Sequence, residues 1–195
     1  MRILLLLLVA VSFMIAGCSS SNEPSVMELF PLKVGNTWTF NFTDEDNVTT
    51  EVVNTVKNEI TILQNEKWFV LDYDNELQSV CKNKSDGFWF ADYNTESKIY
   101  TPELVYKYPA STGNQYETNS GIKVKVVSIN EKITVPFGTF DCYHYEIDYG
   151  DDMVTDEYFA PNVGLIKLVS YAVEAGQKIK KSTTELKSFV FKKNE

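Results

Sequence analysis

The sequence has 195 residues, a length that suits one domain with its own hydrophobic core. Its 18 Lys and Arg residues against 27 Asp and Glu residues give a formal net charge of −9 at pH 7. Phosphate backbones and anionic lipid headgroups repel such a surface, so nucleic acid is not an expected partner.

The first 17 residues have the features of a secretion signal. One basic residue, Arg2, precedes an apolar run over residues 3–16, which is too short to span a bilayer comfortably. The run ends in Ile15-Ala16-Gly17-Cys18, which resembles the lipobox of bacterial lipoprotein signals. The resemblance implies that residues 1–17 are removed and that the Cys18 thiol is lipidated, so that a lipid attaches the protein to a membrane.

Residues 18–28 are small and polar, and we expect them to form a flexible lipidated tether to a single β-rich domain at residues 29–195. Ser19, and not aspartate, follows the lipidated cysteine. By resemblance to the sorting rules of bacteria with two membranes, this predicts a position in the outer membrane, facing the periplasm. In a host with one membrane, the protein would lie on the outer face of the cytoplasmic membrane.

Alternation of apolar and polar residues predicts β-strands along most of this domain. In residues 37–43, Trp38, Phe40 and Phe42 alternate with polar residues, as in a half-buried strand. Further strands are predicted over residues 48–56, 68–73, 77–81, 88–91, 122–129, 140–149, 153–159, 165–173 and 184–191. Turn-forming residues separate them, and the structural turns include Gly35, Gly138, Pro161 and Gly164.

We therefore predict an all-β protein with a single curved antiparallel sheet of about nine to eleven strands and little helix. Such a sheet could form a half-barrel, a barrel-like structure or a sandwich. No window of about eleven residues has the apolar stripe of an amphipathic helix. The best place for a short helix is residues 102–106.

Two cysteines remain after Cys18, and the sequence leaves two interpretations open. Cys81 and Cys142 could form a disulfide in an oxidising compartment, closing a loop of about 60 residues. Alternatively, both are free buried thiols, because cysteine is among the most often buried residue types.

His144 is the only histidine, so it limits the catalytic chemistry. Cys142, His144 and Glu146 would share one face of a strand, where a nucleophile, a base and an orienting carboxylate could in principle meet. However, residues two apart on a strand have Cα atoms about 6.5 to 7 Å apart, which makes a direct hydrogen bond hard to form. We expect a solvent-facing histidine and no catalytic residue.

No cofactor or metal site is expected either. The acidic run at residues 148–152 lacks the ligand spacing of an EF-hand and is better interpreted as a hairpin turn. The nine glycines are scattered, and they form neither a phosphate-binding loop nor a dinucleotide fingerprint.

Three segments look familiar together: F-P-L-K-V-G-N-T-W at residues 30–38, V-P-F-G-T-F-D at 135–141 and Y-F-A-P-N-V-G-L-I-K at 158–167. In this order they resemble a broad set of uncharacterised bacterial exported proteins and lipoproteins. The resemblance implies a curved antiparallel sheet like the half-barrel of lipoprotein carriers. It brings no known activity and no catalytic residues.

The chain is also rich in aromatic residues, with 3 Trp, 11 Tyr and 12 Phe. These rings could fill the core and form cross-strand pairs, or they could line a groove for an apolar ligand. We expect a lipid-anchored protein of the cell envelope, acting as a non-catalytic binding or scaffolding module for an apolar ligand or an envelope partner. The alternative is a carboxylate-dependent envelope hydrolase, which two buried carboxylates facing each other in a cleft would favour.

Overall fold

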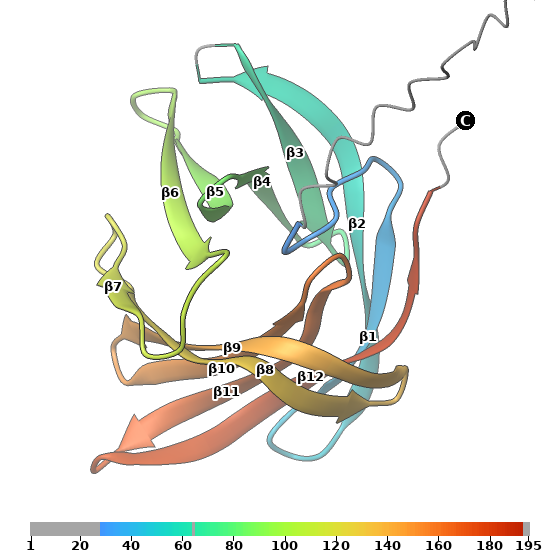
Figure 1. Ribbon diagram of the computed structural model, residues 1–195, viewed down its shortest axis with the longest axis vertical. Coiled ribbons are helices and arrows are strands. Elements are labelled where there is room, and N and C mark those ends of the chain that lie inside the picture. The colour runs from blue at the N-terminus through green and yellow to red at the C-terminus, as the bar shows by residue number, and fades with distance from the viewer. Residues whose placement is uncertain (1–27, 64, 193–195) are drawn as a thin grey trace, which may run out of the picture.

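The structure is a computed structural model that describes residues 28–63 and 65–192 (Figure 1). The regular secondary structure of these residues consists of twelve β-strands. In chain order they are β1 (Thr37–Thr43), β2 (Thr49–Ile62), β3 (Glu66–Tyr73), β4 (Leu77–Lys84), β5 (Gly87–Asn94), β6 (Ile99–Lys107), β7 (Gln115–Glu117), β8 (Lys123–Val135), β9 (Gly138–Gly150), β10 (Met153–Ala160), β11 (Gly164–Glu174) and β12 (Gln177–Val190).

All twelve strands belong to one antiparallel sheet, in the order β6-β5-β4-β3-β2-β1-β12-β11-β10-β9-β8-β7. Strands that follow one another in the chain pair with each other, except β6 and β7. In addition, β1 pairs with β12 and so joins the first half of the domain to the last. The sheet curves until its two halves face each other (Figure 1). Its two free edges are β6 and β7, which follow one another in the chain.

The predicted strand count is wrong, although the antiparallel all-β class is correct. The structure has twelve strands in one open sheet, where nine to eleven were expected, and the described residues contain no helix. Residues 102–106, the best place in the sequence for a short helix, lie within strand β6. Proline lacks a backbone donor, so it is tolerated in a strand mainly at a sheet edge, and Pro102 occupies the edge strand. The short strand β7 was also missed.

The core lies on the inner face of the curved sheet. Trp38 and Phe40 are fully buried, as the alternation in β1 predicts. The segment before β1 also enters the core, because the Phe30 ring packs 4.4 Å from Trp38 and 5.5 Å from Phe88, centroid to centroid. Asn83 Nδ2 donates to the Phe30 carbonyl oxygen at 2.6 Å, which holds this segment against β4. The N-terminal segment thus closes one end of the space inside the sheet.

Side chains connect the two free edges of the sheet. The hydroxyl of Tyr116 on β7 donates to the Val105 carbonyl at 2.7 Å and accepts from the Lys107 amide at 2.9 Å, and both residues lie on β6. Tyr145 on β9 donates to the Lys107 carbonyl at 2.7 Å. These two tyrosine hydroxyls form hydrogen bonds with backbone groups of β6 that would otherwise pair with a neighbouring strand. The edge of β6 is therefore partly covered.

Several predictions concern residues 1–27, which lie outside the described residues: the signal peptide at 1–17, lipidation at Cys18 and nearly all of the tether at 18–28. No helix among residues 28–63 and 65–192 is long and apolar enough to cross a membrane.

Cys81 and Cys142 are both buried free thiols in the structure, the second of the two interpretations that the sequence leaves open. Each thiol donates to a backbone carbonyl, Cys81 to Phe69 and Cys142 to Phe140. Burial raises the pKa of Cys142 to about 12 and raises the pKa of Cys81 even further. Neither thiol is therefore ionised at neutral pH.

Candidate functional site

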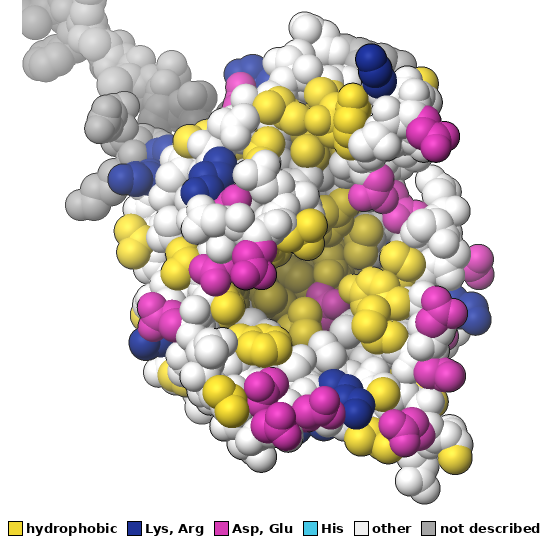
Figure 2. Space-filling view, turned by 180° about the vertical axis from the view of Figure 1, so that it is seen from behind, with side chains coloured by type: hydrophobic (Ala, Val, Ile, Leu, Met, Phe, Trp, Pro, Cys, Tyr) yellow, Lys and Arg dark blue, Asp and Glu magenta, His cyan; other side chains and the backbone are white. Residues whose placement is uncertain are grey.

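An open cleft of about 350 Å³ lies on the inner face, between the two halves of the sheet. Figure 2 shows a hollow with hydrophobic walls and acidic side chains around its mouth. The side chains that line the cleft are mostly apolar or aromatic: Phe30, Asn54, Leu71, Tyr73, Leu77, Ser79, Phe88, Phe90, Asp92, Glu103, Val105, Tyr106, Ile122, Tyr149, Glu157, Phe159, Leu165 and Leu168. They come from both halves of the sheet and from the N-terminal segment, so the curvature creates the cleft.

A buried carboxylate stands among these apolar side chains. Glu157 lies on β10 between Thr155 and Phe159 on the inner face and is only 3% exposed. Three hydroxyls donate to it: Tyr106 to Oε2 at 2.6 Å, and Thr155 and Tyr149 to Oε1 at 2.8 and 3.1 Å. The partners come from β6, β9 and β10, so this hydrogen-bond cluster spans both halves of the sheet.

The surroundings raise the pKa values of the groups in this cluster. Burial raises the pKa of Glu157, although the hydrogen bonds from Tyr106, Thr155 and Tyr149 act in the opposite direction. Burial together with the charge of Glu157 raises the pKa of Tyr106 and Tyr149 well above the ordinary tyrosine range. The tyrosines therefore stay protonated at any physiological pH and act as donors to the carboxylate.

Sequence reasoning did not select Glu157, Tyr106 or Tyr149 as site residues. The alternation in residues 153–159 places Glu157 on the same face as Phe159, and an acidic residue on the apolar face of a strand is a signal that could have been used. The same alternation places Thr155 beside Glu157, but it could not find Tyr106, which is 51 positions away in the chain.

Two buried carboxylates line the cleft, Glu157 and Glu103, and each of them is held by its own hydrogen-bond donors. In the described part of the chain, the side chains that hydrogen bond to Glu157 are all hydroxyls, and no second carboxylate is among them. Glu103 also lines the cleft, but both of its oxygens accept from Ser120, from the amide at 2.6 Å and from Oγ at 2.9 Å.

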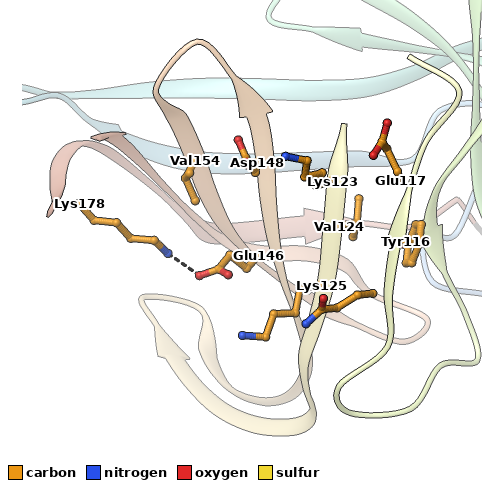
Figure 3. Close-up of a pocket in the computed structure, with 10 residues that line it drawn as sticks. Tyr116, Glu117, Lys123, Val124, Lys125, Glu146, Asp148, Val154 and Lys178 are labelled. Carbon is orange, nitrogen blue, oxygen red and sulfur yellow. Dashed lines mark hydrogen bonds and ion pairs between the residues drawn. The ribbon is translucent and has the colours of Figure 1, made fainter. Parts of the chain in front are cut away.

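A larger hollow of about 610 Å³ lies against β7 to β10, lined mostly by side chains of the outer face (Figure 3). Its charged groups compensate one another. Lys178 Nζ donates to Glu146 Oε2 at 2.7 Å, and the strand register places Lys123 opposite Asp148 and Lys125 opposite Glu146. Because acidic and basic side chains lie opposite one another in its lining and half of the lining residues are exposed, this hollow is the weaker candidate for a ligand site.

His144 lies outside the cleft and is buried between two carboxylates. Its Nδ1 lies 2.8 Å from Glu131 Oε2, and its Nε2 lies 3.2 Å from Asp156 Oδ1. The expectation of a solvent-facing histidine is therefore wrong, because His144 is only 8% exposed. The structure does not bring Cys142 and His144 together as a dyad, since both imidazole nitrogens face carboxylates and the Cys142 thiol donates to a carbonyl.

This cluster predicts a pH-dependent stability. Burial alone would lower the pKa of His144, but the hydrogen bonds and charges of Asp156 and Glu131 outweigh it and raise the pKa above the ordinary value of 6.5. The imidazolium thus stabilises the fold below pH 6.5, and this contribution is lost as the pH rises through the raised folded-state pKa. We expect a loss of about 1.5 kcal/mol, the lower end of the net range for hydrogen bonds to charged groups.

Urea denaturation at a pH below 6.5 and at a pH above the raised pKa of His144 measures this loss of stability. His144→Gln keeps hydrogen-bonding capacity without a titrating group, so the difference between the native chain and this variant isolates His144. If the two proteins lost stability in parallel as the pH rises, the proposed origin in His144 would be wrong.

The acidic run forms the expected hairpin turn. Gly150 ends β9, and Asp151 and Asp152 connect it to β10; the three residues have positive φ angles of 76°, 48° and 58°. The Gly150 amide donates to Asp148 Oδ1 at 2.9 Å. Across the described ranges, no group of three or more His, Cys, Asp and Glu side chains is arranged to hold a metal ion.

The predicted structural turns occupy boundaries of strands. Gly35 precedes β1, Gly138 begins β9, Pro161 follows β10 and Gly164 begins β11. Gly164 has a φ of +101°, and a Cβ placed there would lie 3.0 Å from the Phe30 ring. A side chain at this position would therefore press on the N-terminal segment that closes the end of the cleft.

The fold and the cleft define a class of protein: a single, strongly curved antiparallel sheet that encloses an aromatic cleft on its inner face. Among solved structures, the chain is similar to a "putative lipoprotein" from Parabacteroides distasonis, with a TM-score of 0.50, 16% identity and coverage of 84% of this chain and 99% of that one. It is also similar to a "putative exported protein with YmcC-like fold" from Bacteroides fragilis, with a TM-score of 0.52, 18% identity and coverage of 85% and 100%.

At these identities the likeness shows a shared fold. No protein-family model matches the sequence, and a comparison with curated proteins gives no match.

Proposed function

We propose that the chain is a lipid-anchored protein of the cell envelope that binds an apolar ligand in its inner-face cleft. The observation that carries this proposal is the cleft itself. Its volume of about 350 Å³ lies in the range of small-molecule sites, and its walls are mainly apolar and aromatic. An apolar surface of this kind gains free energy when a ligand replaces water on it.

The location rests on the N-terminal sequence. The lipobox-like segment that ends at Cys18 supports lipidation, and the names of the two structural relatives, a lipoprotein and an exported protein, agree with it. A lipid at Cys18 would hold the cleft near the membrane surface, where apolar molecules are found. The acidic surface argues against direct binding to anionic headgroups, so the membrane contact is assigned to the lipid alone.

Binding of the neutral fluorescent probe N-phenyl-1-naphthylamine tests the cleft. We expect the probe to become brighter when it binds to a chain that begins at Ser19. Ser79 lines the cleft, so Ser79→Trp should fill it and weaken binding by about tenfold or more, as expected for lost access to a buried apolar site.

Ser188→Trp is the matched control. Ser188 pairs with Thr39 on the outer face of the sheet, away from the cleft, so this variant should bind the probe like the unmodified chain. Melting temperatures of both variants would show that they fold. Absence of probe binding to the unmodified chain, or equal binding by both folded tryptophan variants, would contradict the proposal.

A further inference from the structure

The buried Glu157 lacks a basic partner within the protein. In the described part of the chain, no Lys, Arg or His side chain forms an ion pair with it. The side chains that line the cleft include three acids, Asp92, Glu103 and Glu157, and no basic residue. A buried carboxylate is costly unless a positive charge or sufficient hydrogen bonds compensate it. The cleft is therefore electrostatically suited to a cation.

The direction of the hydrogen bonds adds a second constraint. Each hydroxyl has a single proton, and Tyr106, Tyr149 and Thr155 all give theirs to Glu157. The cluster can still offer a ligand lone pairs on the hydroxyl oxygens and on Glu157 Oε2, which, within residues 28–63 and 65–192, accepts a hydrogen bond only from Tyr106. This end of the cleft can therefore accept hydrogen bonds, but it has little capacity to donate them.

The aromatic lining supports the same chemistry. Seven of the lining side chains are Phe or Tyr. The Tyr106 ring lies 4.6 Å from that of Phe159 and 6.2 Å from that of Phe88, centroid to centroid. Aromatic faces attract cations, and the attraction increases where water is excluded. The same rings provide an apolar surface for a hydrocarbon chain.

We propose that the cleft selects amphiphiles with a protonated amine, placing the ammonium group at Glu157 and the hydrocarbon chain along the aromatic wall. This inference rests on the proposed function, because it specifies the class of ligand for the same cleft. It predicts rejection of fatty acids, whose carboxylate would meet three acids and few free donors.

Competition against N-phenyl-1-naphthylamine with three ligands of equal chain length tests the proposal on the unmodified protein. The ligands are dodecylamine, dodecanol and dodecanoate, each below its critical micelle concentration at neutral pH. We expect dodecylamine to bind about tenfold or more tightly than dodecanol, since a hydrogen bond between charged groups is worth more than a neutral one. Dodecanoate should bind more weakly than both.

Two variants assign the selectivity to Glu157. Glu157→Gln removes the charge at nearly constant shape, so dodecylamine and dodecanol should bind within about twofold of each other while the neutral probe still binds. Asp92→Asn removes a solvent-exposed acid from the same cleft and should change the selectivity by less than about threefold, because water screens exposed charges.

The outcomes separate the two proposals. If the neutral probe does not bind to the unmodified protein, the proposed function fails. If the probe binds but dodecylamine does not compete better than dodecanol, only the selectivity for amines is wrong. The comparison of the three ligands needs no variant, so the proposal remains testable even if Glu157→Gln does not fold.

Discussion

Replacing Trp38 with alanine is expected to lower the free energy of unfolding by about 3 to 5 kcal/mol, the usual cost of truncating a fully buried aromatic side chain. Trp38 has no exposed surface. Its Nε1 donates to the Val163 carbonyl at 2.6 Å, and its ring contacts Phe30 and Phe191 at centroid distances of 4.4 and 5.8 Å. The substitution therefore leaves a cavity, removes a buried hydrogen bond and loosens the N-terminal segment.

Trp89→Ala is the matched control for this prediction. Trp89 is only half-buried, and its indole donates to the exposed Asp86 at 2.8 Å. We expect a loss of about 1 kcal/mol, since little cavity forms at a solvent-facing position. Urea denaturation followed by circular dichroism measures both variants without relying on tryptophan fluorescence. Similar losses at the two positions would show that the core is not centred on Trp38.

Local patterns in the sequence were sufficient to predict most of the strands. Trp38 and Phe40 alternate with polar residues because β1 has one buried and one exposed face, and such a period is visible without any knowledge of the partner strands. The pattern fails at β6, which contains residues 102–106, the best place in the sequence for a short helix. Whether a proline can lie in a strand depends on whether that strand is at the edge of the sheet, which is a property of the whole fold.

The cleft could not be predicted because it depends on how distant strands meet. Pairing of β1 with β12 and the curvature of the sheet bring β6 and β10 together across the inner space, so that Tyr106 reaches Glu157. Alternation indicates which face a residue occupies, but it gives no information about what lies opposite. The aromatic richness of the chain was consistent with either a packed core or a groove, and the structure contains both.

Replacing Gly87 with alanine is expected to destabilise the fold by about 3 kcal/mol or more, at the upper end of the range for inserting atoms into a packed site. A Cβ at this position would lie 2.0 Å from the Tyr106 carbonyl oxygen and 2.8 Å from Leu104 Cδ1. Gly87 pairs with Lys107, so β5 and β6 would have to separate to make room for the methyl group. The φ of +148° adds strain for any residue with a side chain.

The same substitution should also damage the cleft, because the displaced strand carries Tyr106, the donor to Glu157 at 2.6 Å. Gly150→Ala is the control: its φ is +76°, but no atom lies within 4 Å of the added Cβ, so only backbone strain of about 1 kcal/mol is expected. Urea denaturation and binding of N-phenyl-1-naphthylamine, measured on both variants, should show large losses for Gly87→Ala alone. Equal stability of the two variants would mean that β5 and β6 do not approach each other this closely, and the position of Tyr106 over Glu157 would then be wrong as well.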